Sequence, residues 1–309
     1  PVARAVVTHA HGDHARSGSG HYDVASSGIG LMQERLGGDS AIKAHDYGST
    51  FRVGDVEVSL HPSGHVLGAA QVRMEYEGRV VVVSGDYKRD PDPTCLPFEP
   101  VPCDVFVTES TFGLPVYRWP SMDGVIDEML AWWDDCARRK IPAVLFCYAL
   151  GKAQRILAEL AKRTNRTVHL HGAMLRLVER YREAGVVMVP TEAVNESAQG
   201  RDFAVELIMA PPSAAGSPWM KRFGKASTGF ASGWMRIRGA RRRRGYDRGF
   251  VVSDHADWPG LVKTIEQSGA SRIYVTHGDG EALIRYLREQ GRDAQSLRVL
   301  RPSDSESGG

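Results

Sequence analysis

A cluster of potential metal ligands follows the first apolar segment of the chain. Residues 9–14 contain three histidines and one aspartate, namely His9, His11, Asp13 and His14. A single histidine is more often a hydrogen-bonded core or surface residue, but a core can rarely satisfy four such side chains in six residues, and imidazole and carboxylate groups are common zinc ligands. Residues two apart on an extended segment point the same way, so His9 and His11 could share one ion. Asp13 and His14 then remain for a second ion.

Further ionisable residues follow other strand-like segments. An apolar run and a small or hydroxylated residue precede Asp86, Glu109, His255 and His277, as they precede the histidine cluster. Ligands of open α/β sheets bind beyond the strand ends, so we expect these groups to converge on one site. Taken singly, each could be a solvated strand end. His65, in a tight Ser-Gly-His loop, is a further candidate.

The elements that must position these residues are a mixture of strands and helices. Short β-branched segments predict strands at 5–7, 56–60, 72–76, 80–83, 105–107, 144–146, 203–208, 250–252 and 273–275. Helical periodicity predicts helices at 121–139, 152–163, 173–184, 259–268 and 279–290. The Glu77-Gly78 pair is typical of a tight hairpin, so part of the sheet is expected to be antiparallel. The pattern predicts an α/β fold with helices covering buried sheets.

Composition excludes several classes of protein. The chain has 309 residues, of which 42% are hydrophobic and 25% charged, values that disfavour wholesale disorder, collagen and coiled coils. No apolar run approaches the roughly 20 residues that a bilayer span requires, so we expect no membrane association. The four cysteines form no CxxC pair and indicate buried thiols in a reducing, cytoplasmic compartment.

Positive charge is concentrated in one segment. Residues 218–250 hold ten Lys or Arg residues against one acidic residue, although the whole chain carries a formal net charge of only +2. Guanidinium groups interleaved with aromatic rings suit a single-stranded nucleic acid, whose bases stack while its phosphates are bound. The alternative is a solvated face. The substrate-binding candidates are Trp234, Arg236, Arg238 and Arg241.

Two shorter segments are candidates for phosphate binding. Gly151-Lys152 is expected to open a helix, whose free amides together with Lys152 could receive an anion, although a simple capping turn is equally consistent with the sequence. Ser213, Gly216 and Ser217 could form a small amide-rich pocket, which would favour recognition of a strand end.

These motifs together resemble a known family. The cluster at 9–14, His65, Asp86 in Ser-Gly-Asp-Tyr, Glu109 in Thr-Glu-Ser-Thr-Phe-Gly, His255 in Ser-Asp-His-Ala-Asp and His277 in Thr-His-Gly are similar to the ordered motifs of metallo-β-lactamase nucleases that carry a β-CASP insert. The resemblance extends from His9 to about Leu287. Within the family, segments 213–219 and 253–258 are similar to bacterial DNA-ligase-associated exonucleases.

The resemblance implies a fold and domain boundaries. It implies an αββα sandwich formed by residues 1–111 and 250–300, with an α/β β-CASP cap domain inserted at 112–249. It also implies two strands ahead of Pro1, so we expect a chain that lacks them. Residues 301–309, rich in Ser and Gly, are expected to form a disordered tail.

The resemblance also assigns roles to the candidate site residues. It implies that His9, His11 and His65 bind one divalent cation, that Asp13, His14 and His277 bind another, and that Asp86 bridges the two. Such a nitrogen and oxygen ligand set suits Zn²⁺ or Mn²⁺. His255 resembles the family's general acid, which Glu109 would orient. Asp13 and Asp86 are counted with the catalytic residues because they would hold the ions that activate water.

The implied activity is that of a two-metal-dependent DNA exonuclease. Such an enzyme would hydrolyse phosphodiester bonds during DNA repair, preferentially in single-stranded DNA, and leave 5′-phosphate and 3′-hydroxyl ends. A DNA ligase and a helicase are the implied partners. The nearest alternative is a ribonuclease of the RNase J or mRNA cleavage-factor type. A thioesterase of the glyoxalase II type would leave His255 and the basic segment unexplained, and a catalytically inactive binding subunit would not need a full set of ligands.

Overall fold

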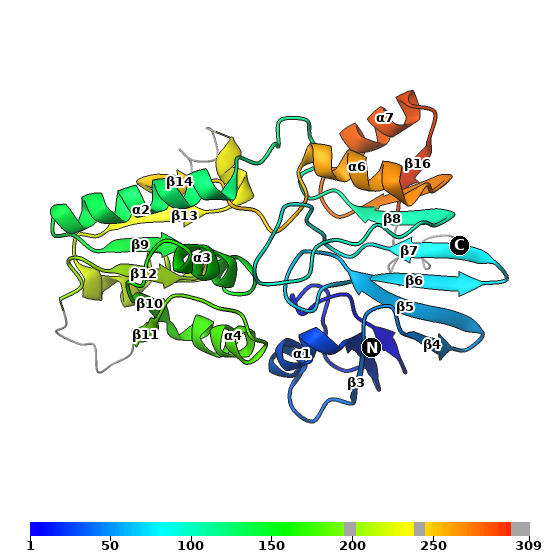
Figure 1. Cartoon of the computed structure of the whole chain (residues 1–309), viewed down its shortest axis with the longest axis horizontal. Helices are drawn as coiled ribbons and strands as arrows, with labels where there is room; N and C mark the ends of the chain where they lie inside the picture. The colour runs from blue at the N-terminus through cyan, green and yellow to red at the C-terminus, as the bar shows by residue number, and fades with distance from the viewer. Residues whose placement is uncertain (195–201, 238–244, 298–309) are drawn as a thin grey trace, which may run out of the picture.

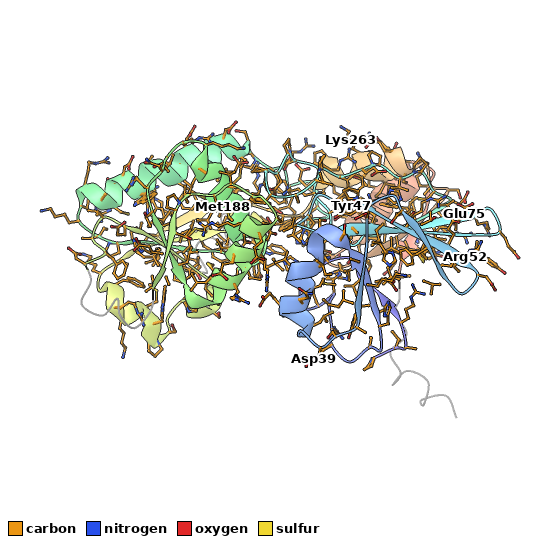
Figure 2. All side chains as sticks on the ribbon, turned by 60° about the horizontal axis from the view of Figure 1, so that its bottom comes forward. Asp39, Tyr47, Arg52, Glu75, Met188 and Lys263 are labelled. Carbon is orange, nitrogen blue, oxygen red and sulfur yellow. The ribbon has the colours of Figure 1, made fainter. Side chains whose placement is uncertain are left out.

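The computed structural model describes residues 1–194, 202–237 and 245–297, which form two lobes joined by several crossing segments (Figure 1). The first lobe contains a seven-stranded and a three-stranded sheet, and the second lobe contains a six-stranded sheet. Arg52 and Glu75 lie at the end of the first lobe that is remote from the second lobe, and Met188 lies in the second lobe (Figure 2). Among the described residues, no helix is both long and apolar enough to cross a bilayer.

A mixed seven-stranded sheet organises the first lobe. The four strands between Thr50 and Val83 pair antiparallel with one another, whereas the last of them and the three strands from Val105 onward run parallel. The spatial order is β16 (Asp293–Ser296), β15 (Arg272–Thr276), β8 (Val105–Glu109), β7 (Arg79–Val83), β6 (Ala70–Tyr76), β5 (Val56–Pro62) and β4 (Thr50–Val53). The predicted hairpin is confirmed, since Tyr76 pairs with Arg79 and the two residues between them have positive φ angles, as a tight two-residue turn requires.

Four layers build the first lobe. Helices α6 (Trp258–Ser268) and α7 (Glu281–Glu289) cover one face of the seven-stranded sheet, where Phe106 and Leu261 share a core. The other face packs on a small parallel sheet of β1 (Ala5–Val6), β2 (Tyr22–Ala25) and β3 (Ile42–His45). Helix α1 (Ile29–Leu36) covers the outer face of the small sheet through Leu31 and Met32. The first lobe therefore consists of a helical layer, two sheets and a second helical layer.

An all-parallel six-stranded sheet organises the second lobe. Helices α2 (Met122–Arg138), α3 (Lys152–Ala161) and α4 (Gly172–Glu183) share a core with one face of this sheet. The strand order is β11 (Thr191–Val194), β10 (Val168–His171), β12 (Leu207–Ala210), β9 (Ala143–Phe146), β13 (Ser227–Ala231) and β14 (Arg248–Phe250). Alternate residues of β9 point to opposite faces, so Val144 and Phe146 reach a second core. The α/β class predicted from the sequence is confirmed.

Two predicted strands are corrected by the structure. The strand expected at 203–208 begins only at Leu207, because residues 203–206 form a turn in which the Glu206 amide donates to the Phe203 carbonyl. The strand expected at 250–252 is β14, which spans Arg248–Phe250 instead. It pairs with β13 in the second lobe. His255 therefore lies in the connection between the lobes rather than directly at a strand end. The predicted tail at 301–309, together with Arg238 and Arg241, lies outside the described residues.

Candidate metal centre

Three of the candidate site residues follow neighbouring strands and lie at one edge of the large sheet. Strands β7, β8 and β15 are adjacent and parallel, and they lead to Asp86, Glu109 and His277. Gly85, just before Asp86, has a φ of +56°, and a Cβ atom there would lie 2.8 Å from the side chain of Thr8. Because glycine tolerates both conditions, Asp86 can approach the loop that follows β1.

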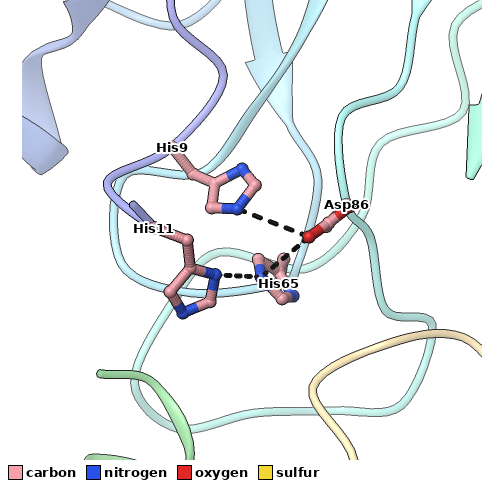
Figure 3. Close-up of side chains that lie close together, drawn as sticks. All are labelled: His9, His11, His65 and Asp86. Carbon is pink, nitrogen blue, oxygen red and sulfur yellow. Dashed lines mark hydrogen bonds and ion pairs between the residues drawn. The ribbon is translucent and has the colours of Figure 1, made fainter. Parts of the chain in front are cut away.

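The first ligand group contains His9, His11, His65 and Asp86 (Figure 3). One potential ligand atom from each residue lies within 4.8 Å of all the others. The Nε2 atoms of His9 and His65 lie 3.4 and 3.7 Å from Asp86 Oδ2. His65 Nδ1 donates to the backbone carbonyl of Asp254 at 2.7 Å, which leaves Nε2 as the lone-pair nitrogen that faces the site.

The second ligand group contains Asp13, His14 and His277. His14 Nε2 lies 3.7 Å from Asp13 Oδ2 and 3.5 Å from Asp86 Oδ2, while His277 Nδ1 lies 3.9 Å from Asp86 Oδ1. His277 has a φ of +52°, an unusual conformation for a histidine that turns the chain sharply after β15. Asp86 therefore contacts histidines of both groups.

Several polar atoms at the centre of the two groups have no hydrogen-bond partner. They are His9 Nε2, His14 Nε2 and Asp86 Oδ1, all fully shielded. Buried polar atoms are hydrogen-bonded in the great majority of cases, so three buried polar atoms without a partner in one place need an explanation. Metal coordination would satisfy all three, and nitrogen and carboxylate ligands suit Zn²⁺ or Mn²⁺. The residues therefore fit a metal site.

Burial prepares the side chains for this role. It lowers the pKa of His9, His11 and His65, and the pKa of His14 falls to about 4. Burial alone would raise the pKa of Asp86, but the contact with His9 and the other imidazoles nearby lower it. At neutral pH the imidazoles are therefore uncharged and the carboxylate ionised, which are the forms that bind cations.

His255 and Glu109 form a hydrogen-bonded pair beside the first ligand group. His255 Nδ1 lies 2.9 Å from Glu109 Oε2, and the His255 ring centroid is 4.8 Å from that of His65. The backbone amide of Tyr87 donates to Glu109 Oε1 at 2.8 Å and fixes the carboxylate. Burial lowers the pKa of His255, but the Glu109 carboxylate more than offsets this and raises the pKa to about 9. His255 therefore keeps its proton at neutral pH.

A cavity of about 730 Å³ opens onto these groups and is lined by both lobes. The predicted substrate-binding residues Ser213, from the 3-10 turn η3 (Pro212–Ala214), and Trp234, from η5 (Gly233–Arg236), line it. Gly216, Ser217 and Arg236 do not line the cavity, and Ser217 Oγ instead donates to Ala214 O at 2.8 Å.

Lys152 lines the cavity but is already paired. Its side chain is almost completely buried and its ammonium donates to Asp254 at 2.8 Å. The backbone amide of Gly151 donates to Gln154 Oε1 at 2.7 Å, so that amide is also occupied. This geometry favours the capping turn over an open anion site at the start of α3.

Metal binding should stabilise the folded chain. Adding Zn²⁺ at about 100 times its Kd is expected to stabilise the native state by about 2.7 kcal/mol, which corresponds to a Tm increase of about 4 °C for a chain of this size. A thermal melt with and without Zn²⁺ measures this shift. His9→Ala should reduce it, whereas His21→Ala, which changes a half-exposed histidine outside both groups, should not. Equal shifts in the two variants would contradict the assignment.

Comparisons with known proteins give relatives of two kinds. The chain is 28% identical over 306 residues to a probable DNA ligase of Opitutus terrae, an alignment that covers 96% of this chain and 29% of that protein. It is 29% identical over 150 residues to the endoribonuclease YSH1 of Gibberella zeae (47% and 18%), and 37% identical over 121 residues to that of Aspergillus fumigatus (38% and 13%). The resemblance to the metallo-β-lactamase/β-CASP nucleases is confirmed. The chain spans less than a third of the length of these relatives, and no protein-family model matches it.

A solved structure supports the fold alone. A crystal structure of a protein of unknown function from Enterococcus faecalis V583 superposes with a TM-score of 0.61 and 12% identity, covering 96% of this chain and 79% of that chain. Because the match covers 96% of this chain, it supports the α/β fold of both lobes. At 12% identity it carries no statement about activity.

Sequence reasoning missed several residues of the site. Asp254 holds His65 through its backbone carbonyl, and Thr8 Oγ1 lies 3.1 Å from His9 Nδ1. The position of Asp254 next to His255 was the available signal for the first. Arg35 and Tyr148 also line the cavity, and nothing in their sequence context indicates it.

Proposed function

We propose that the chain is the nuclease part of a two-metal-dependent DNA exonuclease. It would hydrolyse phosphodiester bonds, preferentially in single-stranded DNA and in DNA repair, and leave 5′-phosphate and 3′-hydroxyl ends. In this proposal residues 1–111 and 250–300 form the metallo-β-lactamase sandwich, and residues 112–249 form the β-CASP cap. The observation that carries the proposal is the position of Asp86 between the two ligand groups. Its Oδ2 lies within 3.7 Å of His9, His65 and His14, and its Oδ1 lies 3.9 Å from His277.

The proposed roles follow from the positions of the side chains. Two divalent cations, when bound, would lower the pKa of a water molecule and stabilise negative charge on the phosphate. His9, His11 and His65 would hold one ion and Asp13, His14 and His277 the other, with Asp86 between them. His255 would give its proton to the departing sugar oxygen, and Glu109 would keep that imidazole charged and oriented.

The choice of DNA rests on the longer of the two kinds of alignment. The relative that aligns with 96% of this chain is named a probable DNA ligase, which supports DNA as substrate and a ligase as a physical partner. A helicase partner rests on the subfamily resemblance alone. The second candidate, an RNA-cleaving enzyme, is supported by the endoribonuclease relatives, although these align with less than half of the chain.

Digestion of matched strands tests the proposal. DNA and RNA strands of the same sequence, labelled at either end, are incubated with the protein and Zn²⁺ or Mn²⁺. We expect the single-stranded DNA to be degraded faster than the RNA and than the duplex, with 5′-phosphate products. A clear preference for RNA would support the ribonuclease instead, and binding without cleavage of either strand would support an inactive subunit.

A further inference from the structure

The cavity contains one arginine that has no role so far. Among the described residues that line it, Arg35 and Lys152 are the two with Arg or Lys side chains. The Lys152 ammonium is held by Asp254 in a buried ion pair, so its charge is neutralised within the protein. Arg35, in the last turn of α1, is exposed. A substrate phosphate that enters the cavity would therefore meet the guanidinium of Arg35 in addition to the protonated imidazole of His255.

Arg35 is fixed against the metal-binding loop. Its Nε donates to the backbone carbonyl of Ala10 at 3.1 Å, and Ala10 lies between His9 and His11. A Cβ atom added at Gly12 would lie 3.2 Å from one Nη atom and 3.6 Å from the other. The guanidinium therefore lies over the short stretch that carries the ligand candidates, and the glycine provides the space for it.

Among the described residues, the remaining guanidinium donors of Arg35 have no acidic partner. Glu34, the adjacent carboxylate, is bound instead by Arg180 at 2.6 Å and by Arg176 at 3.2 Å, which joins α1 to α4 of the second lobe. Within residues 1–194, 202–237 and 245–297, no carboxylate forms an ion pair with Arg35. In the part of the chain that the structure describes, Arg35 donates through Nε alone, to a neutral carbonyl, so the Nη groups keep their capacity for a bidentate contact with phosphate oxygens.

We propose that Arg35 binds a backbone phosphate of the substrate and positions the strand against the metal-binding loop. The inference rests on the proposed function and adds a residue that the sequence motifs do not contain. Arg35 is hydrogen-bonded to the metal-binding loop through the Ala10 carbonyl and not through a ligand side chain. Its contribution would therefore be to substrate binding rather than to the retention of metal ions.

Arg35→Gln in the full chain tests this inference. One charge-assisted hydrogen-bonding contact with a phosphate corresponds to a KM increase of about 10- to 100-fold for single-stranded DNA. The slope of log(kcat/KM) against log salt concentration should become shallower by about 0.7, the value for one phosphate contact on a single strand. Metal content should equal that of the wild type, and hydrolysis of the small diester bis(p-nitrophenyl) phosphate should change far less than hydrolysis of the strand. Arg285→Gln, a change of an exposed arginine on α7 outside the cavity, is the matched control.

The outcomes separate this inference from the proposed function. An unchanged KM and salt slope in an active Arg35→Gln protein would overturn the role of Arg35 and leave the nuclease intact. Parallel losses of metal content and of activity on both substrates would assign Arg35 a structural role instead and also overturn it. A wild-type protein that cleaves neither DNA nor RNA would remove the proposed function, and the inference with it.

Discussion

Replacing Asp86 with alanine is expected to abolish hydrolysis while nucleic-acid binding largely persists. Asp86 lies within 4 Å of histidines from both ligand groups, so its removal disturbs both proposed ion sites at once. Loss of such a bridge costs several kcal/mol of transition-state stabilisation, which corresponds to a decrease in kcat of about a thousandfold or more. The measurement is single-turnover cleavage of labelled single-stranded DNA, together with elemental analysis of bound metal.

Two further variants make this experiment decisive. Asp86→Asn keeps the shape of the side chain, so a similar loss of activity would show that the charge is needed and not merely the volume. Asp39→Ala removes an exposed carboxylate in the turn after α1 and should cleave like the wild type (Figure 2). Turnover by Asp86→Ala within tenfold of the wild type would refute the two-metal assignment.

The convergence of the candidate ligands was predictable because parallel strands end at the same edge of a sheet. Asp86, Glu109 and His277 each follow an apolar run, and their strands are adjacent in the large sheet. The histidine cluster was recognisable because its ligands are neighbours in the sequence. The side chains lie together as expected from these two local signals, while their binding of metal stays a prediction.

Other elements could not be predicted because tertiary contacts override their local sequence. Strand β2 contains Asp23, yet it is fully buried, since Arg4 and His45 pair with that carboxylate at 2.6 and 2.7 Å. Helix α1 is only eight residues long and contains a glycine at its second position, so its periodicity is too short to recognise. The role inferred for Arg35 depends on this helix and was therefore not visible in the sequence.

The partners of charged side chains are a further limit of sequence reasoning. A run of charged residues predicts the sign of the local electrostatic potential but not where the side chains lie. A lysine near the start of a helix gives the same sequence pattern whether its ammonium is free or paired. Lys152 is paired because Asp254, 102 residues later in the chain, reaches it at the junction of the two lobes. Such a long-range contact has no local signal.

His255→Ala is expected to lower kcat by about 10²- to 10⁴-fold without loss of metal or of DNA binding. The pKa of His255 is raised to about 9, so the imidazole is protonated below that pH and can donate to the departing oxygen. The wild-type rate should therefore fall as the pH rises through about 9, and the variant should lack this alkaline limb. Glu109→Gln removes the charge that raises this pKa and should move the limb to lower pH. A pH series of single-turnover rates measures all three proteins.

A substrate that needs no protonated leaving group separates acid catalysis from a structural role. Bis(p-nitrophenyl) phosphate releases a stable phenolate, so His255→Ala should lose much less activity on it than on DNA. His61→Ala is the matched control, because His61 also pairs with a carboxylate, Glu99 at 3.0 Å, but lies outside the cavity. Equal losses on both substrates, with the alkaline limb retained, would mean that His255 supports the site without donating the proton, and the leaving-group oxygen would require another acid.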